Sequence, residues 1–216
     1  MATAAPEAPD LSSLPEALRS LAARGVQRSY RKGTLIIEEG SHGDTLYLLL
    51  RGKVRAFSSD ARGREVTYGV YSAGDYFGEM SLDGGPRAAS VIADSACVCI
   101  VLTRQSLHEH IAAEPIFAFE LIGRLIRRAR LATQSARSMA LLDVYGRVVQ
   151  LLESLAVDRA DGSRVIEERL THANVAARVG CSREMVSRLM KDLVQGGYLQ
   201  PEGAGLKIVR RAPPHW

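Results

Sequence analysis

The sequence has few cysteines and no long apolar run, and both absences narrow the class of protein. Only three of the 216 residues are cysteine, an odd and small number that argues against a disulfide scaffold and predicts a reducing, cytoplasmic location. No apolar run approaches the roughly 18–20 residues that cross a bilayer, so we predict no membrane partner. The first ten residues, MATAAPEAPD, lack the basic start and apolar middle of a signal peptide, and we expect a disordered arm.

The sequence also lacks the clusters that would hold a metal ion or carry out catalysis. Cys97 and Cys99 are two apart in a predicted strand, unlike the ligands of a zinc ribbon, which favours a buried structural role. His108 and His110 are two apart on a predicted helix, so their side chains diverge, and we expect solvent-exposed or capping roles. No nucleophile is paired with a base. We therefore predict no metal site, no catalytic residue and no enzyme activity.

The charge of the chain is mildly basic and unevenly distributed. The formal net charge is +4, and eight lysines and arginines stand against three acidic residues between Arg169 and Arg211. A locally basic segment favours a polyanion partner such as nucleic acid. A solvated charged surface is the alternative.

The longest helical pattern of the chain runs from about Pro115 to Leu142. Its apolar or small residues recur at alternating steps of four and three, a heptad pattern on one face of a helix. This narrow stripe favours pairing with the same helix of a second copy, and packing against the helix's own domain is the alternative. The stripe consists of Ala118, Ile122, Leu125, Ala129, Ala132, Ala136 and Met139, and all but Ala118 are predicted dimer contacts.

The segments on either side of this helix differ in their patterns. Between Val26 and Leu102, short apolar or alternating runs are separated by glycines, which predicts an antiparallel barrel or sandwich. Thr103 is predicted to cap a short helix that leads into the long one. After the long helix, Asp143 is predicted to cap a further helix, and the break between these helices is a natural hinge.

One glycine-rich segment, from Gly74 to Val91, interrupts the predicted strands. A single helical turn with free N–H groups, followed by Arg87, suits a phosphate group. Glu79 in the same segment can accept hydrogen bonds from hydroxyl groups. An ordinary structural loop is the alternative.

The strongest pattern in the chain runs from Leu170 to Leu193 and predicts a helix-turn-helix. Thr171 caps the first helix, Gly180 makes the turn and Ser182 caps the second helix. The second helix is predicted to expose Arg183, Glu184, Ser187, Arg188 and Lys191. Arginine can bind guanine through two hydrogen bonds and glutamate can accept one from cytosine, so this face suits DNA. A helical hairpin without function is the alternative.

Short motifs in the strand region fall in an order that resembles the cyclic-nucleotide-binding β-roll. These motifs are Gly33–Ile36, Gly40, Leu46–Tyr47, Gly52–Val54 and Phe77–Glu79. In that family the Phe-Gly-Glu…Arg-Ala segment, here Phe77 to Ala88, is the phosphate-binding cassette. The resemblance implies that Gly78 and the cassette backbone meet the cyclic phosphate, that Glu79 holds the ribose 2′-hydroxyl, and that Arg87 pairs with the phosphate. Ala88 stands where bacterial members often have serine. Glu79 and Arg87 are eight residues apart, whereas the family's segment is longer by one or two.

Two further motifs, Leu142–Arg147 and Val179–Arg188, resemble the cyclic-AMP receptor protein (CRP/FNR) family of bacterial transcription regulators. The likeness covers about residues 12–211. It implies that Arg128 pairs with the cassette glutamate. The family's two adenine-facing hydroxyl positions fall on Ala132 and Thr133, so one hydroxyl is lost and one is kept.

The same resemblance gives roles to the exposed residues of the helix-turn-helix. Arg183, Glu184 and Arg188 would read base edges of TGTGA-type half-sites. Thr171, Ser182 and Lys191 would touch phosphates. A hairpin wing is predicted to follow, from about Tyr198 to Val209.

We therefore predict an α+β chain with four parts. They are a disordered arm (1–10), a cyclic-nucleotide-binding-like β-roll sensor domain (11–112), a long dimerisation helix (113–142) and a winged helix-turn-helix DNA-binding domain (143–216).

The predicted function is that of a cytoplasmic, ligand-responsive transcription activator that binds palindromic double-stranded DNA as a homodimer, with RNA polymerase as a further partner. Its predicted effector is a cyclic nucleotide: cyclic AMP, cyclic GMP or cyclic di-GMP. One alternative is a regulator of the same family that senses a different ligand or none. The other is a cyclic-nucleotide regulatory subunit of a signalling enzyme.

Overall fold

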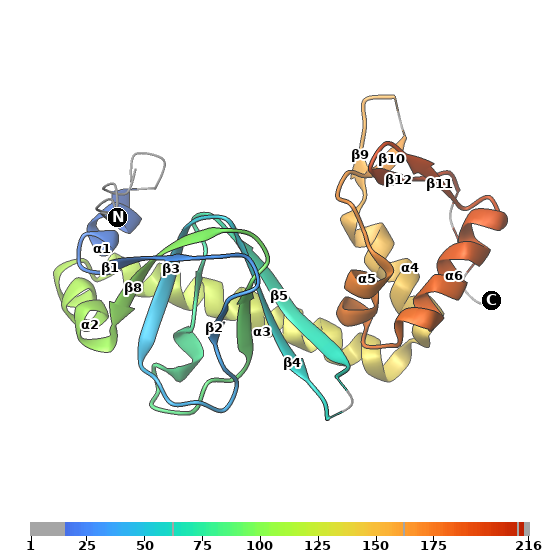
Figure 1. Cartoon of the computed structure of the whole chain (residues 1–216). Coiled ribbons are helices and arrows are strands. Elements are labelled where there is room, and N and C mark those ends of the chain that lie inside the picture. The colour runs from blue at the N-terminus through green and yellow to red at the C-terminus, as the bar shows by residue number, and fades with distance from the viewer. Residues whose placement is uncertain (1–15, 62, 162, 211, 214–216) are drawn as a thin grey trace, which may run out of the picture. The chain divides into compact units, whose positions relative to one another are not determined.

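The computed structural model describes residues 16–61, 63–161, 163–210 and 212–213 (Figure 1). The predicted disordered arm, residues 1–10, lies outside this part of the chain. The chain divides into two compact units, Met1–Ser58 with Tyr68–Arg128 and Ser59–Thr67 with Ala129–Trp216.

The first unit is built on two four-stranded sheets (Figure 1). The sheet of strand order β1-β8-β3-β6 contains β1 (Val26–Tyr30), β8 (Cys97–Thr103), β3 (Thr45–Arg51) and β6 (Tyr76–Phe77), all paired antiparallel. The sheet of strand order β2-β7-β4-β5 contains β2 (Leu35–Ile37), β7 (Ser90–Ala93), β4 (Lys53–Ser59) and β5 (Glu65–Ser72). These strands confirm the predicted α+β class with an N-terminal β-rich domain.

The alternation of side chains along β3 creates two separate clusters of buried residues in the first unit. Leu46 and Leu48 point into a cluster formed with the helices, whereas Leu49 joins the cluster between the two sheets. Neighbouring residues of β3 are buried on both sides because the helices cover one face of this strand and the second sheet covers the other.

Three helices pack against the outer face of the first sheet. They are α1 (Glu16–Ala22), α2 (Arg104–Ala113) and α3 (Ile116–Leu141). Leu107 of α2 and Phe117 of α3 lie in the same cluster as Leu21 of α1. The Thr103 hydroxyl accepts a hydrogen bond from the Ser106 N–H and caps α2, as predicted.

The two cysteines of β8 have the structural role that the sequence predicts. Cys97 and Cys99 are free, buried thiols in the cluster between the sheets. Burial raises the pKa of Cys99 to about 12, which keeps this thiol protonated and unreactive. Gly52 lies beside Cys97 in the left-handed conformation, with φ 97°. A Cβ at this position would come within 2.4 Å of the Ala96 carbonyl oxygen, so only glycine fits there.

The prediction that both histidines of α2 are exposed or capping is wrong for His110. His108 is exposed, but His110 is completely buried, with its ring edge-on to Phe117 at a centroid distance of 4.9 Å. Neither ring nitrogen of His110 has a hydrogen-bond partner among the described residues. Burial lowers the pKa of His110; Glu114 acts in the opposite direction and Arg24 in the same direction. The sequence pattern missed this residue because histidine is not counted as apolar.

The second unit contains the predicted helix-turn-helix and wing. Its elements are α4 (Val144–Leu155), β9 (Val157–Asp158), β10 (Arg164–Ile166), α5 (His172–Val179), α6 (Arg183–Gln195), β11 (Leu199–Glu202) and β12 (Gly205–Ile208). The strands form one sheet of order β11-β12-β10-β9. A cluster around Val148, Val175 and Leu193 fills the core between α4, α5 and α6.

The predicted caps of the second unit are confirmed. The side chains of Asp143, Thr171 and Ser182 accept hydrogen bonds from backbone N–H groups three residues ahead. Gly180 ends α5 in the left-handed conformation with φ 70°, which glycine adopts without strain. None of the described helices is long and apolar enough to cross a membrane.

We expect His110 to make the first unit less stable in acid. The folded-state pKa of His110 is lowered, so below about pH 6.5 the unfolded chain binds more protons than the folded chain. Stability is therefore fully present above this pH and falls as pH decreases, by up to about 1.4 kcal/mol per pH unit. His110→Leu should flatten this dependence, as measured by urea unfolding at about pH 7.5 and about pH 5.5.

The exposed neighbour His108 provides the control for this experiment. His108→Leu should keep the wild-type dependence of unfolding free energy on pH. An equal dependence in His110→Leu and wild type would show that another group causes the acid sensitivity.

Candidate functional site

The predicted cassette begins at a sharp change of backbone direction between β6 and a single 3-10 turn, η1 (Glu79–Ser81). Gly78 makes this change with φ 87°. A Cβ at Gly78 would lie 2.9 Å from the Thr45 carbonyl oxygen and 3.0 Å from Nη1 of Arg87. Only glycine therefore allows this close approach.

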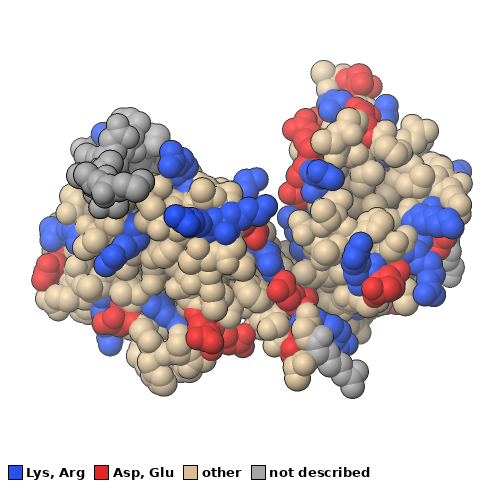
Figure 2. All heavy atoms as spheres, viewed as in Figure 1, with Lys and Arg blue, Asp and Glu red and all other residues tan. Residues whose placement is uncertain are grey.

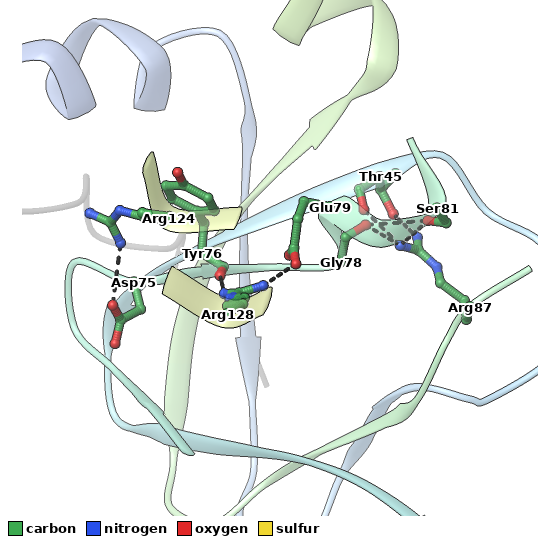
Figure 3. A network of polar contacts seen from close by, with 9 residues as sticks. All are labelled: Thr45, Asp75, Tyr76, Gly78, Glu79, Ser81, Arg87, Arg124 and Arg128. Carbon is green, nitrogen blue, oxygen red and sulfur yellow. Dashed lines mark hydrogen bonds and ion pairs between the residues drawn. The ribbon is translucent and has the colours of Figure 1, made fainter. Parts of the chain in front are cut away.

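Glu79 is a buried carboxylate held by Arg128 of α3 (Figure 3). Nη1 of Arg128 donates to Oε1 of Glu79, and Nη2 donates to the Tyr76 carbonyl oxygen at 2.5 Å. The other carboxylate oxygen, Oε2 of Glu79, is buried and has no hydrogen-bond partner among the residues that the structure describes. The structure thus brings together two residues 49 positions apart, as the resemblance implies, and leaves one acceptor open.

The ring of Tyr71 completes the surroundings of Arg128. The guanidinium carbon lies 4.7 Å from the centre of this ring, a favourable cation–π distance. Burial by itself would lower the pKa of Arg128, but the Glu79 carboxylate outweighs it, and the pKa is raised above the ordinary value. Arg128 is therefore a permanent cation at this site.

Arg124 repeats the arrangement one helical turn earlier (Figure 3). It donates to the Gly74 carbonyl oxygen and to Oδ1 of Asp75, both at 3.2 Å. Its guanidinium carbon lies 4.4 Å from the ring centre of Tyr76. Two arginines on one face of α3 thus hold the strand that enters the cassette.

Arg87 lies inside the cassette and is buried (Figure 3). Its Nη1 donates to three acceptors, the carbonyl oxygens of Thr45 (3.0 Å) and Gly78 (2.9 Å) and the Ser81 hydroxyl (2.7 Å). Its Nη2 donates to the Thr45 hydroxyl at 2.8 Å. No ion pair joins Arg87 to a carboxylate among the described residues, so its positive charge is not neutralised by them.

These features define what the cassette can bind. An open carboxylate oxygen suits a hydroxyl donor, and a buried cation without a counter-charge suits an anion. Among the described residues, no group of three or more His, Cys, Asp or Glu side chains could hold a metal ion.

The other predicted ligand residues lie at exposed positions. Ala88 follows Arg87 and contributes no hydroxyl. Thr133 lies in the second half of α3, where its hydroxyl donates to the Ala129 carbonyl oxygen at 3.0 Å. Sequence reasoning missed Thr45 and Ser81, because small hydroxyl residues in a strand and a turn carry no distinctive signal.

The predicted dimer stripe is exposed along α3. Its six residues, Ile122, Leu125, Ala129, Ala132, Ala136 and Met139, are all accessible to solvent in the chain. Phe119 is 75% exposed and Ile126 46%, so they widen the same apolar face. Neither residue falls on the heptad positions that begin at Ala118, so the pattern did not include them.

Met139, at the end of the stripe, lies close to the turn of the helix-turn-helix. Its methyl carbon would be 3.4 Å from a Cβ placed on Gly180.

The exposed face of α6 carries the predicted DNA-reading residues. Arg183, Glu184, Ser187, Arg188 and Lys191 line one open hollow. Basic atoms gather over α6 in Figure 2, with acidic atoms beside them. The opposite side of α6 buries Val186, Met190 and Leu193, so the core fixes which face is presented.

Local hydrogen bonds orient three polar side chains of the helix-turn-helix. They are the hydroxyls of the capping residues Thr171 and Ser182 and the carboxylate of Glu184. Thr171 and Ser182 accept from the N–H groups of Asn174 and Met185. The pKa of Glu184 is lowered by its own backbone N–H, by the Ser182 hydroxyl and by Arg183. Glu184 is therefore a charged hydrogen-bond acceptor at neutral pH.

Arg147 ties the hinge before α4 to the turn of the helix-turn-helix. Its Nε donates to the Val179 carbonyl oxygen and its Nη1 to that of Leu142, both at 2.9 Å. Because Arg147 binds both carbonyl groups, a displacement of Leu142, which follows α3, would be transmitted to Val179 at the end of α5.

Comparison with known proteins identifies both units. Residues 27–114 match the sequence profile of the cyclic nucleotide-binding domain, and residues 146–212 match that of the Crp-like helix-turn-helix domain. A CRP-like cAMP-activated global transcriptional regulator from Mycobacterium tuberculosis (strain ATCC 25618 / H37Rv) is 30% identical over 198 residues, which cover 90% of this chain and 88% of the relative. The cAMP-activated global transcriptional regulator CRP from Pasteurella multocida (strain Pm70) is 32% identical over 186 residues, covering 83% and 88%.

Solved structures of similar proteins agree with this result. The catabolite activator protein of Thermus thermophilus is 30% identical with a TM-score of 0.54, and the match covers 90% of each chain. The c-di-GMP responsive global regulator CLP of Xanthomonas campestris is 24% identical with a TM-score of 0.77, covering 89% of this chain and 97% of that one, which shows the shared fold. The relatives are transcription regulators, not enzymes. The chain described here belongs to the CRP/FNR family of transcription regulators, with a cyclic nucleotide-binding domain followed by a Crp-like helix-turn-helix domain.

Proposed function

We propose that a cyclic nucleotide bound at the cassette controls the binding of a dimer of this regulator to palindromic DNA in the bacterial cytoplasm. The observation that carries the proposal is the pair of open groups in the cassette. Within the described part of the chain, Oε2 of Glu79 is a buried acceptor without a donor, and Arg87 is a buried cation without a carboxylate partner. A cyclic nucleotide supplies both a ribose hydroxyl and a phosphate anion.

Three cyclic nucleotides are candidates for this site. The M. tuberculosis relative is named as cAMP-activated and the X. campestris protein as c-di-GMP responsive. Ala88 offers no hydroxyl to the phosphate, which favours a contact through Arg87 and the cassette backbone. Cyclic AMP, cyclic GMP and cyclic di-GMP should therefore be titrated separately.

We expect Glu79→Gln to weaken binding of the effector by about 1.5–3 kcal/mol, the range for a hydrogen bond to a charged group. The amide keeps the shape of the side chain but removes the charge that both Arg128 and a ribose hydroxyl use. Isothermal titration calorimetry of wild type and variant measures the difference. Glu38→Gln, at an exposed position, is the control and should bind as wild type does.

A wild-type protein that binds none of the three nucleotides would reject a cyclic-nucleotide effector. It would then favour a family member that senses a different ligand or none. The family assignment does not depend on this result.

Dimer formation is supported by the exposed apolar face of α3. A helix that leaves Phe119, Ile122 and Ile126 exposed presents an apolar face of the kind that marks protein–protein interfaces. A two-fold axis would place the same face of a second copy against it, with Ala129, Ala132 and Ala136 allowing close approach.

We expect the double variant Leu125→Glu, Ala129→Glu to be monomeric, because four carboxylates would meet at the interface. Light scattering coupled to gel filtration measures the mass. Arg127 is exposed on the opposite side of the same helix, so the control variant Arg127→Glu should remain a dimer. A wild-type protein that is monomeric at micromolar concentration would rule out the proposed assembly.

DNA reading is supported by the set of side chains on α6. Arg183, Glu184 and Arg188 offer donors and an acceptor that match guanine and cytosine edges, which is consistent with TGTGA-type half-sites. In a two-fold dimer the two α6 helices would enter successive major grooves roughly 34 Å apart. RNA polymerase, as the enzyme that a bound activator recruits, is the further partner that we propose.

We expect Glu184→Ala and Lys191→Ala to have different effects on DNA binding. Without the Glu184 acceptor, the protein should tolerate other bases at one symmetric position of the selected site. The loss of discrimination against the wrong base at this position should be about 1–3 kcal/mol. Losing Lys191 should weaken all sequences equally and reduce the salt slope by about one, because it acts on phosphate. Selection of sites from a random DNA pool, followed by salt titration, measures both effects. If Glu184→Ala selects the wild-type motif with equal stringency, Glu184 does not read a base.

A further inference from the structure

We propose that Thr45 and Ser81 are positioning residues that direct one edge of the Arg87 guanidinium toward an anionic ligand, and that Gly43 keeps this edge free. This inference rests on the proposed function, since it assigns the phosphate contact of the cassette to specific donor atoms. None of these three residues has a role predicted from the sequence.

The hydrogen bonds of Arg87 use one side of its guanidinium. Nη1 carries two hydrogens, and it faces the carbonyl oxygens of Thr45 and Gly78 and the Ser81 hydroxyl. One hydrogen of Nη2 is used by the Thr45 hydroxyl. Because Thr45 binds Nη1 and Nη2 together, these bonds lie along the edge that the two groups share. Within the described part of the chain, the Nε–H group and the second hydrogen of Nη2 have no acceptor, and in a planar guanidinium they point in parallel from the neighbouring edge. Two parallel donors at this spacing match two oxygens of a phosphate group.

Thr45 determines the direction of this edge. Its carbonyl oxygen binds Nη1 and its hydroxyl binds Nη2, so the guanidinium cannot turn without breaking both bonds. The backbone of Thr45 is fixed in turn by its pairing with Thr103 of β8.

Ser81 provides the second fixed point. Its hydroxyl donates to the Gly78 carbonyl oxygen at 3.2 Å while it accepts from Nη1 of Arg87 at 2.7 Å. All these acceptors are neutral, so they orient the cation without cancelling its charge. Arg87 therefore keeps its attraction for an anion, although the residue itself is only 6% exposed.

Gly43 lies beside the free edge. A Cβ there would be 2.9 Å from Nη2, 3.3 Å from Nε and 3.4 Å from the guanidinium carbon of Arg87. The segment is held in place because the Arg87 N–H donates to the Ser41 carbonyl oxygen (2.8 Å) and the Gly40 N–H to that of Arg87 (2.9 Å). An alanine methyl at Gly43 would therefore occupy the space that an anion needs.

The test uses the full-length protein in separate calorimetric titrations with cyclic AMP, cyclic GMP and cyclic di-GMP. Thr45→Val keeps the size and the carbonyl of Thr45 but loses the hydroxyl, and it should weaken binding by about tenfold, as for one hydrogen bond to a charged group. Gly43→Ala should weaken binding by a similar factor. Thr45→Ser restores the hydroxyl and should bind as wild type does. Thr67→Val, on β5 and without a bond to Arg87, is the matched control.

Thermal unfolding of each variant separates positioning from loss of fold. If Thr45→Val binds with wild-type affinity, the inference is overturned while the proposed function stands. If Thr45→Val unfolds at a lower temperature than wild type, its affinity is not interpreted, and the affinities of Ser81→Ala and Gly43→Ala test the inference instead. Wild-type affinity in both of these variants overturns the inference. A wild type that binds none of the three nucleotides overturns the proposed effector and this inference together.

Discussion

The ion pair between Arg128 and Glu79 is the contact on which the first unit depends, because it joins the longest described helix, α3, to the cassette. The Glu79 side chain is 2% exposed, whereas that of Asp75, the partner of Arg124, is 43% exposed. An exposed pair contributes little to stability, but breaking a buried pair leaves an uncompensated charge and costs about 3–5 kcal/mol. Arg128 and Glu79 therefore fix where α3 meets the cassette, and Arg124 supports the same contact from one turn away.

Buried polar groups without partners have two different meanings in this unit. Oε2 of Glu79 lies beside the cation of Arg128 in a segment rich in polar groups, and its acceptor, which is open among the described residues, is the reason for proposing a ligand there. The ring nitrogens of His110 lie instead in an apolar cluster with Phe117, where protonation opposes folding. The chemistry of the neighbours, and not burial by itself, separates a binding group from a destabilising one.

The second unit is organised in a simpler way, by helix caps and an apolar core. Thr171 and Ser182 cap the two helices, while Val186, Met190 and Leu193 fix the rotation of α6 and so present Arg183 and Arg188 to solvent. Arg147 connects the turn of this motif to the end of α3 through the carbonyl oxygens of Val179 and Leu142. A regulator of this kind needs such a connection if a ligand-dependent movement of α3 is to reach the DNA-binding face.

The sequence by itself determined the elements whose hydrogen bonds are local. The caps at Thr103, Asp143, Thr171 and Ser182, the turn at Gly180 and the exposed face of α6 follow from residues three or four apart, and the motifs of the cassette and the recognition helix pointed to the family. Only the tertiary structure decided the partners of Arg87, since Thr45 is 42 residues away, and those of Arg124, whose carboxylate partner is 49 residues away. It also decided that His110 is buried. These contacts depend on which strands become neighbours in the sheets and on how the helices cover them, and no local pattern of side chains specifies that arrangement.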